Sequence, residues 1–198
     1  MHTSGISAVK RFIALIAFSS LLAGIQAAQA GTTMETKGKA FAPPAFASFC
    51  GREPGLCSTS GDKKVVALQA DLKSELKQVN RAVNSRIKER NDSGDDWRVP
   101  VAYGDCEDFA ILKKRELLKR GWPASALLLT VARYRGEGHT VLTVRTSEGD
   151  LILDNLTSSI RDWSSTPYSY FARQAQGNGS RWERIGTAKP ILSTAFGG

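Results

Sequence analysis

Histidine and cysteine are scarce in this chain of 198 residues, which contains two histidines and three cysteines. His2 lies within the first thirty residues, so His139 alone remains if that segment is removed. A site of the Cys-His-His kind, used by some hydrolases of cell-wall peptides, needs a second histidine and is therefore disfavoured. The longest apolar run is also shorter than the roughly 20 residues that a membrane-spanning helix needs, and no internal repeat is visible.

The first thirty residues have the pattern of a secretory signal peptide. Lys10 and Arg11 precede a mostly apolar run, residues 12–24, and Ala28-Gln29-Ala30 is an A-x-A cleavage site. No cysteine follows the run, which disfavours a lipoprotein anchor; an uncleaved anchor helix is the alternative. We therefore expect cleavage near Ala30, a periplasmic location and no membrane insertion after cleavage.

The remaining 168 residues suit one domain with a sizeable core. Residues 31–48, rich in Ala, Pro, Thr and Lys, are expected to form an extended lead-in to a domain over residues 49–198. Removing the signal leaves a net charge of +6, because 25 basic and 19 acidic residues remain. The basic residues are scattered without interleaved aromatics, which disfavours nucleic-acid binding and favours a solvated basic surface over an anionic partner.

The three cysteines divide into a pair and a single residue. Cys50 and Cys57 bracket a turn-prone stretch, residues 52–55, and an exported protein meets an oxidising compartment. We expect a local disulfide between them. Cys106 is then an unpaired thiol, which in a secreted protein marks either a reactive group or a buried inert one.

Apolar periodicity predicts two helices followed by strands. The apolar residues of 65–87 recur at steps of three and four, which is typical of an amphipathic helix. A second helix is expected from Cys106 to about Arg120, with Gly121 as its stop. Strands are predicted over residues 126–134, 140–146 and 151–153, and a last edge strand over 181–185. This order indicates the α+β class.

Cys106 is placed where a helix begins. Gly104 permits a sharp turn, Asp105 is a plausible N-cap, and Asp108 follows in a near capping-box position. The backbone N–H groups and the dipole of a helix start favour negative charge, and hence a thiolate. These features make Cys106 a candidate nucleophile.

The acidic residues around Cys106 work against that thiolate. Asp105, Glu107 and Asp108 crowd one helix start, and like charge disfavours ionisation of the thiol. A dipole contribution of roughly 0.3–1 kcal/mol does not clearly exceed the effect of three carboxylates. Either the acids point away and only cap the helix, or a positive group lies among them. An imidazolium and a calcium ion, which prefers oxygen ligands, are the two candidates.

His139 is the candidate general base, because no other group of near-neutral pKa remains. Asp154, at the end of an apolar strand, is the candidate that orients its imidazole, with Asn155 as the alternative. Direct opposition of His139 and Asp154 requires a turn centred two residues before Glu148-Gly149, so we expect a bulge or an offset loop. The N–H of Cys106 is one candidate oxyanion donor. Trp97 could line the cleft or belong to the core.

These motifs resemble the bacterial transglutaminase-like cysteine proteinases over about residues 49–182. The resemblance rests on Gly104-Asp105-Cys106-Glu107-Asp108, Gly138-His139-Thr140-Val141-Leu142 and Leu153-Asp154-Asn155, with Asn80, Asn84 and the approach over residues 97–100. It implies a papain-like, transglutaminase-like peptidase fold, with the nucleophile at a helix N-terminus packed on an antiparallel sheet. The implied triad is Cys106, His139 and Asp154.

The resemblance also implies a cofactor and partners. Asp105 and Glu107 correspond to acids that bind calcium in this family. The implied substrate is a large surface adhesin of biofilms, and the implied regulator is an inner-membrane receptor for cyclic di-GMP. The Cys50/Cys57 pair departs from the family pattern, so the substrate and regulator could differ. We expect a cysteine endopeptidase; acyl transfer to an amine and a non-catalytic binding module on the same fold are the alternatives.

Overall fold

The structure is a computed structural model that describes residue 1 and residues 31–91 and 94–190. Except for Met1, the predicted signal peptide lies outside the described residues. In chain order the elements are β1 (Thr32–Ala40), α1 (Phe46–Arg52), α2 (Pro54–Cys57), α3 (Ala70–Arg86), β2 (Lys88–Glu89), β3 (Tyr103–Gly104), α4 (Cys106–Lys119), η1 (Ala124–Ala126), β4 (Leu127–Tyr134), β5 (Glu137–Thr146), β6 (Gly149–Leu153), β7 (Arg161–Asp162), η2 (Trp163–Ser165), β8 (Ser169–Ala175) and β9 (Asn178–Pro190).

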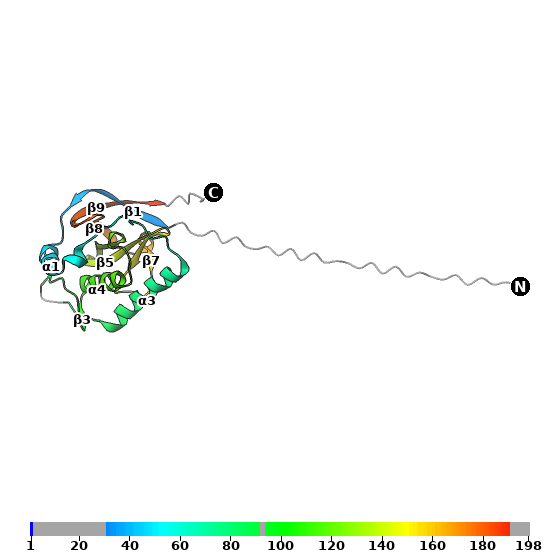
Figure 1. The fold of residues 1–198 in the computed structure, drawn as a ribbon, viewed down its shortest axis with the longest axis horizontal. Helices are drawn as coiled ribbons and strands as arrows, with labels where there is room; N and C mark the ends of the chain where they lie inside the picture. Colours follow the sequence, from blue (N-terminus) through cyan, green and yellow to red (C-terminus); the bar gives the residue numbers. More distant parts are fainter. Residues whose placement is uncertain (2–30, 92–93, 191–198) are drawn as a thin grey trace.

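One antiparallel sheet of seven strands, in the order β1-β9-β8-β4-β5-β6-β7, forms the centre of the fold. Short turns join β4 to β5, β5 to β6 and β8 to β9, and the pairing of β4 with β8 joins the half made of β4 to β7 to the half made of β1, β8 and β9. A two-stranded parallel sheet of β2 and β3 lies apart from it. The helices and this sheet confirm the predicted α+β class (Figure 1).

The helices bury one face of the sheet, where α4 packs on β5 and α3 packs on α4. Apolar residues at the predicted spacing on α3 meet the sheet in the larger core cluster, which includes Leu76, Val79, Val83, Ile111, Leu129, Leu142 and Val144. The helix predicted over residues 65–87 is α3, and it begins at Ala70 rather than at residue 65. Val66 instead bridges Thr146, and its N–H donates to the carbonyl of Arg145 at 3.0 Å. That bond to β5 holds the backbone of Val66 outside the helix.

The opposite face of the sheet is covered by β1 and by the segment after β7. A smaller core cluster there contains Met34, Val141, Ile152 and Trp163. The N–H of Met34 donates to the buried carboxylate of Asp150 at 2.8 Å, so the sheet curls until β1 approaches β6.

Two expectations about the ends of the domain need correction. Residues 31–48, expected as a lead-in, contribute β1 to the main sheet and the start of α1. Residues 181–185, expected as an edge strand, lie in β9, which is flanked by β1 and β8. Only Met34 of β1 is fully buried, so the strand lacks the apolar alternation that reveals a strand in a sequence.

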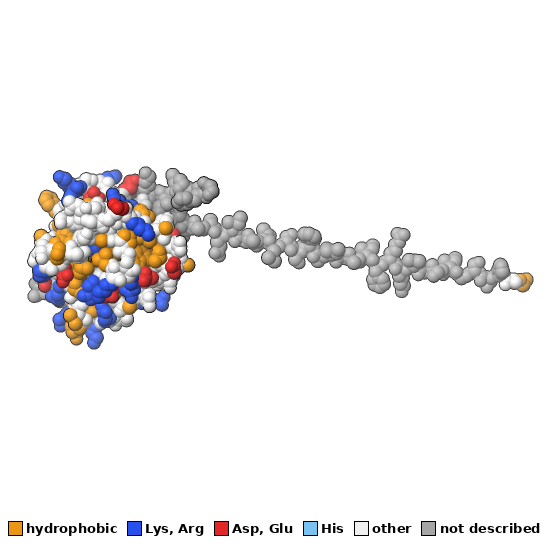
Figure 2. Space-filling view, viewed as in Figure 1, with side chains coloured by type: hydrophobic (Ala, Val, Ile, Leu, Met, Phe, Trp, Pro, Cys, Tyr) orange, Lys and Arg blue, Asp and Glu red, His pale blue; other side chains and the backbone are white. Residues whose placement is uncertain are grey.

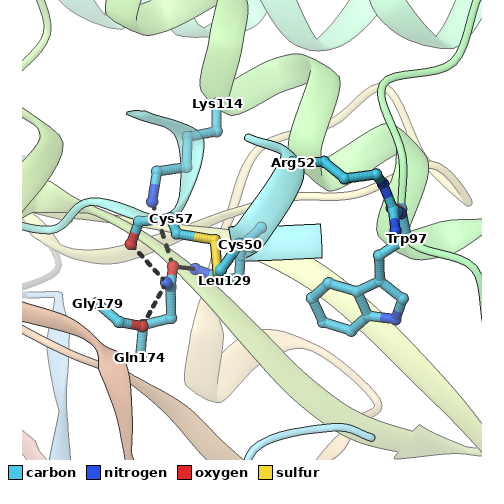
Figure 3. The surroundings of a disulfide bond; sticks show 8 residues. All are labelled: Cys50, Arg52, Cys57, Trp97, Lys114, Leu129, Gln174 and Gly179. Atoms are coloured by element: carbon cyan, nitrogen blue, oxygen red, sulfur yellow. Dashed lines mark hydrogen bonds between the residues drawn. A yellow bond between two sulfur atoms is a disulfide. The ribbon is translucent and has the colours of Figure 1, made fainter. Parts of the chain in front are cut away.

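The expected disulfide joins Cys50 of α1 to Cys57 of α2, with an S–S distance of 2.00 Å (Figure 3). The buried amide of Gln174 fixes this region to the sheet. Its nitrogen donates to the carbonyls of Cys57 at 3.0 Å and Gly179 at 2.9 Å, and its oxygen accepts the N–H of Leu129 at 3.0 Å. The disulfide loop is therefore attached to β4, β8 and β9.

No helix in the described part of the chain is long and apolar enough to cross a membrane. Figure 2 shows the Lys and Arg side chains of one face at several separate places, with Asp and Glu among them. This arrangement agrees with the scattered charge of the sequence.

Two lysines of α4, Lys113 and Lys114, are completely buried. The ammonium of Lys114 donates to the amide oxygen of Gln174 at 3.2 Å. Burial lowers the pKa of both lysines to about 7, from an ordinary value of 10.5. Between these values the unfolded chain binds more protons than the folded chain, so the stability of the fold rises with pH in this window.

Raising the pH from 7 to 9 should increase the free energy of unfolding by about 2 kcal/mol for each buried lysine. Lys114→Met should lose about half of that increase, because it removes one of the two buried lysines. The amide oxygen of Gln174 keeps a partner in this variant, since it still accepts the N–H of Leu129. Urea unfolding at the two pH values measures the effect, with the exposed Lys77→Met as the control. Equal increases in the wild type and Lys114→Met would contradict the prediction.

Candidate active site

The start of α4 presents the one free thiol, Cys106. Gly104 is needed there because a Cβ atom would lie 2.7 Å from the Cβ and Oδ2 of Asp108. Close packing, rather than a sharp turn, therefore explains this glycine. Asp105 is the N-cap residue, as predicted, but its side chain makes no capping hydrogen bond. The carboxylate of Asp108 accepts the N–H of Arg98 at 2.9 Å and so holds residues 97–100, the approach segment, against α4.

The sulfur of Cys106 lies between β5 and a carboxylate. It accepts the N–H of Thr140 at 3.3 Å and donates to Oε2 of Glu107 at 3.2 Å. Burial raises the pKa of the Cys106 thiol, and the charges of Glu107 and Asp105 raise it further, against the opposing effect of the Thr140 N–H. Burial and the two acids therefore favour the protonated thiol over the thiolate.

The two acids beside the thiol lack sufficient positive partners. Burial raises the pKa of the Glu107 carboxyl to about 8, with a further increase from Asp105. Oδ1 of Asp105 is buried and has no hydrogen-bond partner among the described residues. An oxygen without a partner and a carboxyl with a raised pKa fit a cation that prefers oxygen ligands, such as calcium.

The described side chains do not by themselves complete a metal site. Across residues 31–91 and 94–190, no group of three or more His, Cys, Asp or Glu side chains is arranged to hold an ion. Calcium accepts backbone carbonyls and water as further ligands. Asp105 and Glu107 therefore fit as part of a ligand set.

The fold brings His139 and Asp154 together, as their sequence motifs predict. Nε2 of His139 lies 3.0 Å from Oδ1 of Asp154, and both side chains are buried. Neither the expected bulge nor an offset loop is present, because β5 and β6 pair regularly from Thr146↔Gly149 to Leu142↔Leu153. Asp154 follows one residue later and reaches His139 as a diagonal neighbour rather than an opposite one.

Two asparagines of α3 hold the loop that follows Asp154. The amide nitrogen of Asn84 donates to the carbonyls of Asp154 at 2.9 Å and Thr157 at 3.1 Å. The amide nitrogen of Asn80 also donates to Thr157, at 3.1 Å. The alternative orienting residue, Asn155, instead points its amide toward Glu89, at 3.4 Å.

Tyr168 is a site residue that the sequence motifs do not reveal. Its hydroxyl donates to Oδ2 of Asp154, and its ring centroid lies 4.9 Å from that of His139. Burial alone would raise the pKa of Asp154, but hydrogen bonds from His139 and Tyr168 outweigh it and leave the pKa below its ordinary value.

Cys106 and His139 line the same cleft, which has a volume of about 290 Å³. Its other lining residues are Glu89, Asn91, Asp105, Tyr134, Arg135, Glu137, Gly138 and Leu156. Trp97 is not among them, since it is 2% exposed and packs edge-on against Phe46 and Trp182. Of its two predicted places, the core is therefore the correct one.

The site combines a thiol at a helix start with an imidazole that is hydrogen-bonded to a buried carboxylate, and both the thiol and the imidazole line one cleft. This arrangement defines the class of cysteine hydrolases and acyl transferases. The profile of the family described as bacterial transglutaminase-like cysteine proteinase (BTLCP) matches residues 36–190. The chain belongs to this family and is a transglutaminase-like cysteine peptidase, which confirms the resemblance inferred from its motifs.

Solved structures of Legionella pneumophila LapG are similar to this chain. The calcium-bound form is 24% identical, has a TM-score of 0.50, and is matched over 79% of this chain and 88% of its own. Another LapG structure is 28% identical with a TM-score of 0.48, over 67% and 75% of the two chains. The calcium-bound form supports the fold. A search of curated proteins found no match.

Alkylation of the single free thiol tests the charges around Cys106. In excess chelator at pH 9, where a Glu107 carboxyl with a pKa of about 8 is ionised, iodoacetamide should modify the wild type slowly, because burial and the charge of Glu107 both favour the protonated thiol. Glu107→Gln removes that charge and should speed modification about tenfold, which corresponds to one pKa unit. Mass spectrometry over time gives the rates, with the exposed Glu53→Gln as the control. Equally fast labelling of the wild type and Glu107→Gln would refute this account.

Proposed function

We propose that this peptidase is a periplasmic endopeptidase that cleaves a protein substrate through Cys106, His139 and Asp154. The 3.0 Å contact between Nε2 of His139 and Oδ1 of Asp154 carries the proposal. With Nε2 engaged, Nδ1 is the ring nitrogen left to exchange a proton with Cys106. The bond from the neighbouring Thr140 N–H to the sulfur supports this assignment.

The reaction begins when His139 accepts the proton of Cys106 and the sulfur attacks the carbonyl carbon of the scissile peptide. The N–H of Cys106, at the start of α4, is a donor to the resulting oxyanion. His139 returns the proton to the leaving nitrogen, and the C–N bond breaks to leave a thioester. Water, deprotonated by His139, then releases the acyl group and regenerates the thiol. Asp154 holds the imidazole and stabilises its charged form.

Calcium is the cation that we propose for the acids beside the thiol, with Asp105 and Glu107 as ligands. The partnerless oxygen of Asp105 and the raised pKa of Glu107 support this, and the relative LapG has a calcium-bound form. When bound, the ion supplies positive charge that offsets the two carboxylates. Their unfavourable effect on ionisation of Cys106 then falls.

The substrate and regulator that we propose come from the family resemblance. The substrate is a large cell-surface adhesin, whose cleavage would release cells from a biofilm. The regulator is an inner-membrane receptor for cyclic di-GMP. The signal-like first thirty residues support a periplasmic location, where both partners are accessible.

Cys106→Ala should lower cleavage of a candidate adhesin by about 1,000-fold or more, because the nucleophile acts as a unit with its base. Gel electrophoresis and mass spectrometry of the products measure cleavage, and circular dichroism verifies the fold. Lys77→Met is the control that should retain activity. Cleavage that survives in folded Cys106→Ala would remove the proposal. A primary amine in the reaction separates hydrolysis from acyl transfer by product mass.

Chelation should lower activity, and calcium should restore it better than magnesium, which demands stricter octahedral geometry. Asp105→Asn and Glu107→Gln should lose the rise in melting temperature that calcium gives the wild type, because they remove ligand charge. Differential scanning calorimetry with and without calcium measures this independently of activity, with Glu53→Gln as the control. Full activity in excess chelator, or an unchanged calcium response in both variants, argues against the site.

A further inference from the structure

Tyr168 lies directly before β8, on the face of the sheet that carries His139 and Asp154. Residues alternate between the faces of a strand, and Val141 and Ile152, two positions from His139 and Asp154, both belong to the smaller core cluster. Tyr168 packs against that cluster and is half-buried. Its position on this face brings a phenol to the far side of the Asp154 carboxylate.

The contacts to Asp154 are divided between its two oxygens. Oδ1 lies at hydrogen-bond distance from Nε2 of His139, at 3.0 Å, and accepts the N–H of Leu156, at 3.2 Å. Oδ2 accepts the hydroxyl of Tyr168, which is its single donor in the described part of the chain. Rotation of a carboxylate about its last torsion is otherwise broad and roughly two-fold. A donor on each oxygen removes that freedom.

The ring of Tyr168 also limits the movement of the imidazole. Its plane is tilted by 54° to the His139 ring at a centroid distance of 4.9 Å. It also meets the ring of Tyr134 edge-on at 5.3 Å. The phenol is thus held between the cleft wall and the core, and it contacts both members of the His139–Asp154 pair.

The neighbouring Tyr170 shows what a purely structural tyrosine does in the same cluster. Its hydroxyl lies 2.9 Å from that of Thr166, and its ring packs against Trp163 at 5.6 Å. Its hydroxyl therefore ends on another hydroxyl, whereas that of Tyr168 ends on an ionised carboxylate. Hydrogen bonds to charged groups are roughly twice as strong as neutral ones, so loss of the Tyr168 hydroxyl has the larger consequence.

We propose that Tyr168 is a positioning residue that fixes the Asp154 carboxylate and, through it, the tautomer of His139. With Oδ2 tied to the phenol, Oδ1 stays directed at Nε2 and keeps the proton on that nitrogen. Nδ1 then carries the lone pair that accepts a proton from Cys106. The catalytic consequence rests on the proposed function, but the effect on the tautomer does not.

Kinetics of Tyr168→Phe test the catalytic consequence. This variant keeps the ring and removes the hydroxyl, so kcat should fall about 10- to 100-fold, the usual cost of misplacing a reacting group. KM should stay within about two-fold, because the hydroxyl points to Asp154 rather than into the cleft. Tyr170→Phe should retain kcat. Urea unfolding of each variant verifies the fold.

A double-mutant cycle shows whether Tyr168 acts through Asp154. In an Asp154→Ala background, Tyr168→Phe should cost less than about two-fold in kcat, because the carboxylate it positions is absent. An undiminished 10- to 100-fold loss in that background would overturn the proposal, since it would mean that the phenol acts independently. Unchanged kcat in the single variant would overturn it as well.

Nuclear magnetic resonance gives a readout that does not depend on turnover. His139 is the single histidine outside the first thirty residues, so the ring nitrogens of the mature, tag-free chain need no further assignment. The wild type and Tyr170→Phe should show the proton on Nε2, and Tyr168→Phe should shift population to Nδ1. That shift in a chain without peptidase activity would support the positioning role and refute the proposed function. An unchanged tautomer in Tyr168→Phe would refute the positioning role.

Discussion

The site depends on one packing constraint: the first turn of α4 lies against the beginning of β5. The Thr140 N–H reaches the sulfur of Cys106 at 3.3 Å, so a strand amide that could bond another strand is directed at the thiol. This contact sets the distance between helix and sheet at the cleft. His139 precedes Thr140, and its position therefore follows from the same contact. Asp108 supports the arrangement from behind by holding the approach segment to α4.

Charge at this helix start is balanced against function. A helix N-terminus and one strand amide favour ionised sulfur, whereas burial and two adjacent acids oppose it. The charges of these acids disfavour the thiolate of Cys106, which is its reactive form. Such perturbed groups cluster at functional sites, which supports a role in ligand binding rather than in stability. The calcium site that we propose would make activity conditional on a cation, so the peptidase would respond to the ionic composition of its compartment.

Local features of the sequence predicted much of the site. The N-terminus of α4 was evident from Gly104, Asp105 and the acidic first turn, and the Cys50/Cys57 pair from its spacing. The strand that carries His139 was predicted to begin at residue 140, close to its start at Glu137. These signals depend on neighbours in sequence, because caps, turns and periodicity act within a few residues.

The parts that sequence reasoning missed depend on contacts between distant segments. Tyr168 meets Asp154 only because β8 packs beside β4, and no local pattern separates it from the structural Tyr170. The diagonal approach of Asp154 to His139 depends on the register of the β5–β6 hairpin. The turn motif Glu148-Gly149 left that register ambiguous in the sequence. β1 escaped notice because its pairing with β9 supplies order that its Thr- and Lys-rich sequence lacks.

That pairing joins the first strand of the domain to its last, with Thr32 opposite Pro190 and Ala40 opposite Trp182. Contacts between residues so far apart in the chain form slowly, since the closure of a long loop must precede them. The central sheet cannot be completed before residues 178–190 have been synthesised. For the exported chain that we propose, such a delay would help to keep the polypeptide unfolded until it has crossed the membrane.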